Sequence, residues 1–123
     1  MKIMIPCMPD HPFVYWANYA YCGELIKSGA RVFRYENGFL HAKTLVVDGE
    51  VSTVGSANFD VRSFRLNFEA NAFVYDKAFA AKMEKTFEDD MKLSTEVTLE
   101  DYESRGLWIK IKEAVSVLLS DIL

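Results

Sequence analysis

A short hairpin in the middle of the chain constrains the fold more than any other stretch. Residues 44–47 and 51–54 are rich in β-branched residues, and Asp48 and Gly49 stand between them. An Asp-Gly pair favours a type I′ turn, because both central residues of that turn need positive φ. The sequence therefore predicts two antiparallel strands joined by a two-residue loop.

The two-residue loop sets the register of the predicted strands. It pairs Val47 with Glu50 and places Lys43 opposite Val54. Side chains alternate between the two faces of a strand. Asp48 lies at the turn with the opposite parity, which indicates a turn-forming residue. We therefore expect one face, near the open end of the hairpin, to carry four polar side chains: His41, Lys43, Ser56 and Asn58.

These four side chains have the chemistry that a phosphate ester requires. A Lys supplies a point cation, and Asn and Ser supply hydrogen bonds. A His acts as a nucleophile or as a proton donor near neutral pH. Phosphoryl transfer depends mostly on positioning and on charge stabilisation. A His near a Lys on a strand is ordinary surface decoration when taken alone, so the joint spacing carries this prediction.

That spacing, His-x-Lys, four residues, Asp, six residues and Gly-Ser-x-Asn, resembles the HKD motif of the phospholipase D superfamily. The resemblance implies that His41 is the nucleophile that forms a phosphohistidine, or the acid that protonates the leaving group. It also implies that Lys43 and Asn58 bind the phosphoryl oxygens, with Ser56 as a supporting contact.

The resemblance gives roles to two acidic residues. The Asp of the motif is Asp48, for which a structural role agrees with its place in the turn. A Glu after the motif commonly orients the His, and Glu69 is the match. A carboxylate on one ring nitrogen fixes the tautomer and stabilises the charged ring. Arg62 and Arg65 follow the motif as candidates for binding a second phosphate, with plain surface solvation as the alternative.

Three flanking stretches are similar to the second half of bacterial cardiolipin synthases: PDHPFVYWA, NGFLHAK and DVRSFRLNFEANAFVYD. This family implies a phosphatidyltransferase that moves a phosphatidyl group between two phosphatidylglycerols and yields cardiolipin and glycerol. It implies no metal and no other cofactor. Two alternatives remain: a homodimeric phosphodiesterase (a nuclease or a phospholipase D) that uses water, and an inactive fragment that docks on a partner lobe.

The resemblance also implies a partner. A complete site in this superfamily uses two His-x-Lys motifs, and this chain carries one. The second motif would come from a homodimer about a two-fold axis, or from the N-terminal part of a longer chain. The implied location of the full enzyme is the cytoplasmic face of the bacterial cell membrane, with the membrane surface as a further partner. The chain itself is expected to be soluble.

Charge and hydropathy limit the classes of partner. The net charge of −4 and the pI of about 5.2 argue against a nucleic-acid backbone as the main partner. No stretch has the roughly 18 uninterrupted apolar residues of a membrane span. Cys7 and Cys22 lack the spacing of metal ligands, and we expect two small thiols in a reduced compartment.

The remaining elements predict an α/β fold with a mixed β-sheet flanked by helices, equal to one lobe of a phospholipase D-like enzyme. We expect a single domain over residues 1–123, with an α/β body over about 1–93 and C-terminal helices over about 98–123. The predicted strands cover 2–5, 31–35 and 68–75, and the predicted helices cover 11–28, 77–92, a short stretch capped by Thr98 and Asp101, and 107–123. Residues 93–97 are expected to be a connector.

The last predicted helix has an apolar stripe. We expect this stripe to dock on the body of the domain or on a partner half, and the alternative is a helix that lies on the bilayer surface. The stripe consists of Trp108, Ile111, Val115, Leu118 or Leu119, and Ile122, with Lys110 and Lys112 beside it.

Overall fold

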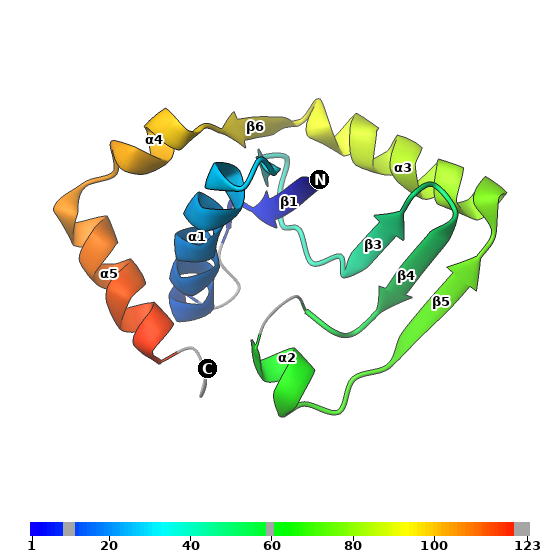
Figure 1. Ribbon diagram of the computed structural model, residues 1–123, viewed down its shortest axis with the longest axis horizontal. Coiled ribbons are helices and arrows are strands. Elements are labelled where there is room, and N and C mark those ends of the chain that lie inside the picture. Colours follow the sequence, from blue (N-terminus) through cyan, green and yellow to red (C-terminus); the bar gives the residue numbers. More distant parts are fainter. Residues whose placement is uncertain (9–11, 59–60, 120–123) are drawn as a thin grey trace. The chain divides into compact units, whose positions relative to one another are not determined.

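The computed structural model describes residues 1–8, 12–58 and 61–119, without the side chains of residues 12, 14, 15, 61 and 62. Strands and helices are interspersed along these residues (Figure 1), which confirms the predicted α/β class. In chain order the elements are β1 (Lys2–Pro6), α1 (Pro12–Lys27), β2 (Arg31–Tyr35), β3 (Thr44–Val47), β4 (Val51–Gly55), α2 (Val61–Arg65), β5 (Asn71–Tyr75), α3 (Lys77–Met91), β6 (Ser94–Val97), α4 (Leu99–Glu103) and α5 (Leu107–Leu118).

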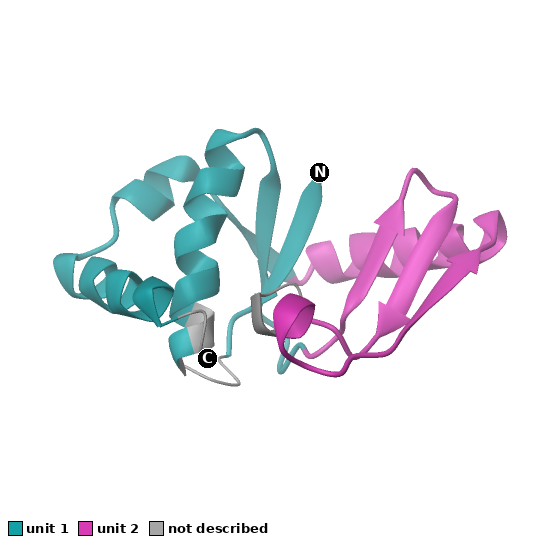
Figure 2. Cartoon of the chain, turned by 60° about the horizontal axis from the view of Figure 1, so that its bottom comes forward, with its two compact units in different colours: residues 1–40, 94–123 teal, residues 41–93 magenta. Residues whose placement is uncertain are grey.

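The chain divides into two compact units (Figure 2). Unit 1 contains residues 1–40 and 94–123, and unit 2 contains residues 41–93. The single domain over residues 1–123 stays a prediction. No helix among the described residues combines the length and the apolar character that crossing a bilayer requires.

Unit 1 is built on a three-stranded mixed sheet in the order β1-β2-β6. β1 and β2 are parallel and are joined through α1, so these three elements form a βαβ unit. β6 runs antiparallel to β2, with Val97 paired to Val32. The prediction of a connector over residues 93–97 is therefore wrong. The short, mostly polar segment has no strand pattern of its own, and it becomes a strand because β2 offers backbone groups for pairing.

The core of unit 1 lies between this sheet and α1. Helix α1 ends in a Schellman motif at Gly29, whose φ is 94°, with Ala30 N donating to Leu25 O at 3.0 Å. The Cys22 thiol is part of the core, and burial raises its pKa to about 11, with the nearby Glu113 charge adding to the effect. The core consists of Cys22, Val32 and Val97, and the half-buried Ile3, Ile5, Tyr19 and Ile26 pack against it.

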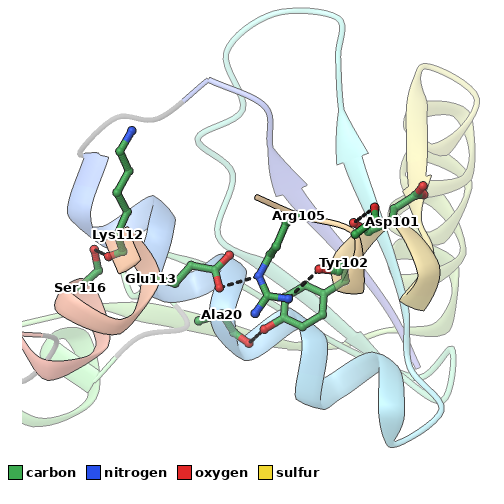
Figure 3. Close-up of polar contacts among 8 residues, drawn as sticks. Ala20, Asp101, Tyr102, Arg105, Lys112, Glu113 and Ser116 are labelled. Atoms are coloured by element: carbon green, nitrogen blue, oxygen red, sulfur yellow. Dashed lines mark hydrogen bonds and ion pairs between the residues drawn. The ribbon is translucent and has the colours of Figure 1, made fainter. Parts of the chain in front are cut away.

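Helices α4 and α5 complete unit 1. Thr98 and Asp101 form the predicted capping box at the start of α4. Tyr102 donates its hydroxyl to the carbonyl of Ala20 in α1 at 3.0 Å, and Arg105 forms an ion pair with Glu113 of α5 at 2.8 Å (Figure 3). These polar contacts connect both C-terminal helices to one another and to α1.

The apolar stripe of α5 does not dock on the body of the domain. Helix α5 packs on α1, and its buried residues are Glu113 and Ser116, which are 3% and 0% exposed. The stripe points outward, and Trp108 is 75% exposed. Docking on the body is therefore wrong for this stripe, whereas docking on a partner half stays a prediction. Ile122 lies outside the described residues.

Unit 2 consists of an antiparallel three-stranded sheet in the order β3-β4-β5, together with α2 and α3. The helix predicted over residues 77–92 is found as α3, which packs on β3 and β4. Its N-cap is Asp76, which accepts a hydrogen bond from Phe79 N at 2.8 Å. β5 begins at Asn71, three residues after the predicted start.

Candidate active site

The β3–β4 turn has the predicted backbone conformation. Asp48 and Gly49 have φ values of 53° and 66°, and Glu50 N donates to Val47 O at 3.1 Å, as in a type I′ turn. Glu50, however, stays outside the ladder, and Val47 pairs with Val51. The predicted register is therefore wrong by one residue, because the extra residue after the turn shifts β4.

This shift changes how the polar residues come together. Lys43 lies opposite Gly55, whose N–H donates to the Lys43 carbonyl at 3.3 Å, and not opposite Val54. Strand alternation does not place the four predicted side chains on one face, because none of them lies in a strand. Two precede the start of β3 at Thr44, and two follow the end of β4 at Gly55. They lie instead in the segments that leave the same end of the hairpin: His41, Lys43, Ser56 and Asn58.

Glu69 is the centre of the polar contacts at this end. The Ser56 hydroxyl donates to Glu69 Oε2 at 2.5 Å, and Asn67 Nδ2 donates to Glu69 Oε1 at 3.2 Å. These two hydrogen bonds are the main reason that the pKa of Glu69 lies below its usual value, and Ser63 and the Lys43 charge act in the same direction. Glu69 is therefore a carboxylate at neutral pH.

The Ser56 hydroxyl also accepts a hydrogen bond from Ala70 N at 3.0 Å, while Ser56 N donates to Ala70 O at 3.0 Å. This close approach of the two segments depends on Gly55. A Cβ on Gly55 would overlap Ala70 O and the side chain of Asn71. Gly55 is thus the residue that allows Ser56 and Glu69 to meet.

Lys43 interacts with the His41 backbone and with the charge of Glu69. Its ammonium group donates to the His41 carbonyl oxygen at 3.0 Å, and its charge lowers the pKa of Glu69. Lys43 is half-buried and His41 is exposed. The structure therefore brings Lys43, Ser56 and Glu69 together, next to a histidine that is accessible to solvent.

Asn58 joins this group through a serine. Asn58 N donates to the hydroxyl of Ser63 in α2 at 3.2 Å, and Ser63 is buried. The Ser63 hydroxyl also lowers the pKa of Glu69 through a hydrogen bond. Ser63 therefore connects Asn58 to the Glu69 carboxylate.

Sequence reasoning missed Ser63, Asn67 and Asn71 as parts of this network. Asn67 has a signal in the sequence, since it lies two residues before Glu69, a spacing that favours one side of an extended segment. Asn71 accepts a hydrogen bond from Ala57 N at 3.3 Å through its side-chain oxygen. Ser63 has no such signal, because its contacts depend on how α2 packs.

The remaining predicted residues lie elsewhere. Asp48 is in the turn at the opposite end of the hairpin, which agrees with a structural role. Arg65 is exposed in α2, and Arg62 is in the same helix with a side chain outside the described residues. A contact of Arg62 or Arg65 with a second phosphate stays a prediction.

Comparison with known proteins gives consistent matches. The family model for the cardiolipin synthase, PLD-like domain, matches residues 1–91. Over all 123 residues the chain is 59% identical to the major cardiolipin synthase of Bacillus subtilis, 58% to a cardiolipin synthase of Listeria welshimeri and 54% to one of Oceanobacillus iheyensis. The chain covers 26% of the length of each of these relatives.

Proposed function

The chain belongs to the cardiolipin synthase PLD-like domain family, and we propose that it supplies one catalytic half of a phosphatidyltransferase. The complete enzyme transfers a phosphatidyl group from one phosphatidylglycerol to a hydroxyl of a second, and the products are cardiolipin and glycerol. The observation that carries this proposal is a hydrogen-bonded Glu69 carboxylate whose pKa is lowered in part by the Lys43 charge. The same Lys43 ammonium donates to the carbonyl of the exposed His41. A carboxylate, a cation and an imidazole at one end of a hairpin suit covalent catalysis at phosphorus.

The transfer takes place in two displacements. An imidazole nitrogen of His41, or of its counterpart in the second motif, attacks the phosphorus atom. The bond from phosphorus to the oxygen of the headgroup glycerol breaks, and the other histidine donates a proton to that oxygen. The hydroxyl of a second phosphatidylglycerol then attacks phosphorus and gives its proton to the same histidine, while the phosphorus–nitrogen bond breaks.

The other site residues support these displacements. Lys43 and Asn58 stabilise the charge on the phosphoryl oxygens, as a cation and as a hydrogen-bond donor. Glu69 orients the imidazole of His41 and stabilises its charged form. Ser56 keeps Glu69 ionised and in place, because its hydroxyl donates to the carboxylate. Asp48 holds the turn.

The second motif comes from outside this chain. The chain spans about a quarter of the length of its curated relatives, so the remainder of a longer protein is the first candidate source of the second His-x-Lys motif. A second copy of this chain about a two-fold axis is the other source. In either case the substrate is reached at the membrane surface, on the cytoplasmic face.

A chimera tests this proposal. The aligned quarter of the Bacillus subtilis relative is replaced by this chain, and cardiolipin formation is measured on vesicles of phosphatidylglycerol. We expect activity close to that of the unaltered relative, and the same activity in EDTA. His41→Ala in the chimera is expected to abolish transfer, and Lys85→Ala on α3 is the matched control.

The products separate this proposal from its alternatives. Phosphatidic acid as the main product would indicate a phosphodiesterase that uses water. Full activity of His41→Ala would remove the nucleophile or acid role. An active chimera beside an inert isolated chain would show that the second half is required, whereas activity of the isolated chain as a dimer would favour a second copy.

A further inference from the structure

The two buried residues of α5 are polar. Glu113 and Ser116 are buried, and the Ser116 hydroxyl donates to the Lys112 carbonyl at 2.7 Å. Glu113 Oε2 accepts from Arg105 Nε at 2.8 Å, and the Arg105 guanidinium lies 3.6 Å from the centre of the Tyr102 ring (Figure 3). An ion pair that is buried in this way is costly to break, so these contacts fix which side of α5 faces the body of unit 1.

The opposite side of α5 is apolar and exposed. An α-helix has about 3.6 residues per turn, so apolar residues three and four positions apart form one continuous stripe. Leu118, at the far end, is 82% exposed. We name this surface the outer stripe, and it consists of Leu107, Trp108, Ile111, Val115 and Leu118.

One lysine lies on each side of the outer stripe. Lys110 and Lys112 are both exposed, and Lys112 extends over the Trp16 ring with its ammonium 5.3 Å from the ring centre. Lysines at the edge of an apolar stripe keep their charge in water while their methylene stems cover apolar surface. A tryptophan in the stripe suits the boundary between lipid chains and headgroups.

We propose that the outer stripe of α5 lies on the surface of an anionic lipid bilayer. The apolar side chains enter the boundary between headgroups and acyl chains, and Lys110 and Lys112 meet the negative headgroups. This inference rests on the proposed function, which requires an anionic phospholipid as substrate. The complementary charge and the tryptophan favour a bilayer over a protein partner for this stripe.

Co-sedimentation with vesicles tests the proposal directly. The chain is mixed with vesicles of phosphatidylglycerol and phosphatidylcholine, and with vesicles of phosphatidylcholine alone. We expect stronger binding to the anionic vesicles. The double variant Ile111→Asp, Leu118→Asp should bind at least about tenfold more weakly, because two apolar side chains no longer leave water.

A matched control separates the stripe from a general charge effect. Phe73 and Tyr75 of β5 are also exposed, so Phe73→Asp, Tyr75→Asp adds the same charge elsewhere and should bind within about twofold of the parent chain. Lys110→Gln should lower the affinity for anionic vesicles about fivefold and leave phosphatidylcholine binding unchanged. Circular dichroism establishes that each variant is folded.

Three results would overturn the proposal. The first is unchanged vesicle binding by the α5 double variant. The second is self-association of the parent chain that the same substitutions abolish, in the absence of vesicle binding, which would make a second copy the occupant. The third is binding of the stripe to the remaining three quarters of the Bacillus subtilis relative in place of lipid. The vesicle assay measures binding and not transfer, so a chimera that fails to form cardiolipin leaves its result unaffected. Failure of the proposed chemistry is therefore distinguishable from failure of this inference.

Discussion

Among the described residues, unit 1 buries large apolar side chains and unit 2 does not, although unit 1 also buries Glu113 and Ser116. Unit 1 has an apolar core in which Val32 is 0% exposed and is packed with Cys22 and Val97. Among its described residues, unit 2 buries small or polar side chains: Ser52, Ser63 and Ala80. One side of the unit 2 sheet even exposes Leu45, Val47, Phe73 and Tyr75.

This difference indicates that one unit carries the predicted site and the other carries most of the apolar burial. All the predicted site residues belong to unit 2, where Glu69, Ser56 and Asn67 hold one another through hydrogen bonds. Unit 1 is stabilised by apolar burial, which supplies the largest favourable term in folding. We therefore expect substitutions at the site to change the chemistry, and substitutions in the core of unit 1 to change the stability.

The largest effect is expected for Lys43→Ala, assayed in the chimera. Loss of a cation that stabilises a transition state lowers the turnover rate by roughly 100-fold to 1000-fold. The midpoint of thermal unfolding should hardly move, because Lys43 is only half-buried. Lys82→Ala, on the exposed side of α3, should leave both quantities unchanged. Loss of less than about tenfold in turnover would remove Lys43 from the phosphoryl site.

The next effect concerns the stability of unit 1. Arg105→Met leaves Glu113 buried without its partner and should lower the free energy of unfolding by about 3 kcal/mol. Urea denaturation of the chain measures it. Arg31→Met removes one member of the exposed Arg31–Glu96 pair and should have little effect. Equal effects of the two substitutions would mean that burial does not decide how much an ion pair contributes to the stability of unit 1.

A smaller effect should distinguish the two units by one chemical change. Val32→Ala removes two buried methyl groups and leaves a cavity, so it should cost about 2 kcal/mol of unfolding free energy. Val54→Ala, in unit 2, should cost less than about 1 kcal/mol, because Val54 is already 40% exposed. The same denaturation experiment measures both. A larger cost at Val54 would mean that unit 2 depends on apolar packing after all.

The smallest effect is a shift in one titration. The pKa of Glu69 is lowered chiefly by the Ser56 hydroxyl, so its contribution to stability is present above the usual pKa of a Glu and is lost as the pH falls through the folded value. Ser56→Ala should raise the pKa of Glu69 and move this loss to higher pH. Carbon NMR of the side-chain carboxyl measures the shift, and Ser28→Ala is the control, since its hydroxyl donates to Glu24 O.

The sequence predicts the β3–β4 turn and the start of α4 well, because both depend on local residue types. Asp48 and Gly49 determine the turn by their backbone preferences, and Thr98 with Asp101 determines the start of α4 in the same way. The spacing of the motif identifies which residue types gather at the end of the hairpin, where Lys43, Ser56 and Glu69 meet.

The errors concern features that depend on distant parts of the chain. The place of Glu50 outside the ladder follows from how β4 pairs with both neighbours. β6 is a strand only because β2 is there to pair with it. The pattern of α5 shows which residues are apolar but not which side meets α1, and that side is set by the contact of Glu113 with Arg105.

Unit 1 is discontinuous in sequence, since residues 1–40 are followed by all of unit 2 before β6 arrives at residue 94. On the ribosome, unit 2 therefore emerges in full before the strand that completes the sheet of unit 1. Contacts between distant segments form slowly, because the intervening chain must first be closed into a loop. The segment that carries the predicted site residues can thus form its hairpin early, while the sheet of unit 1 is completed only when β6 follows unit 2.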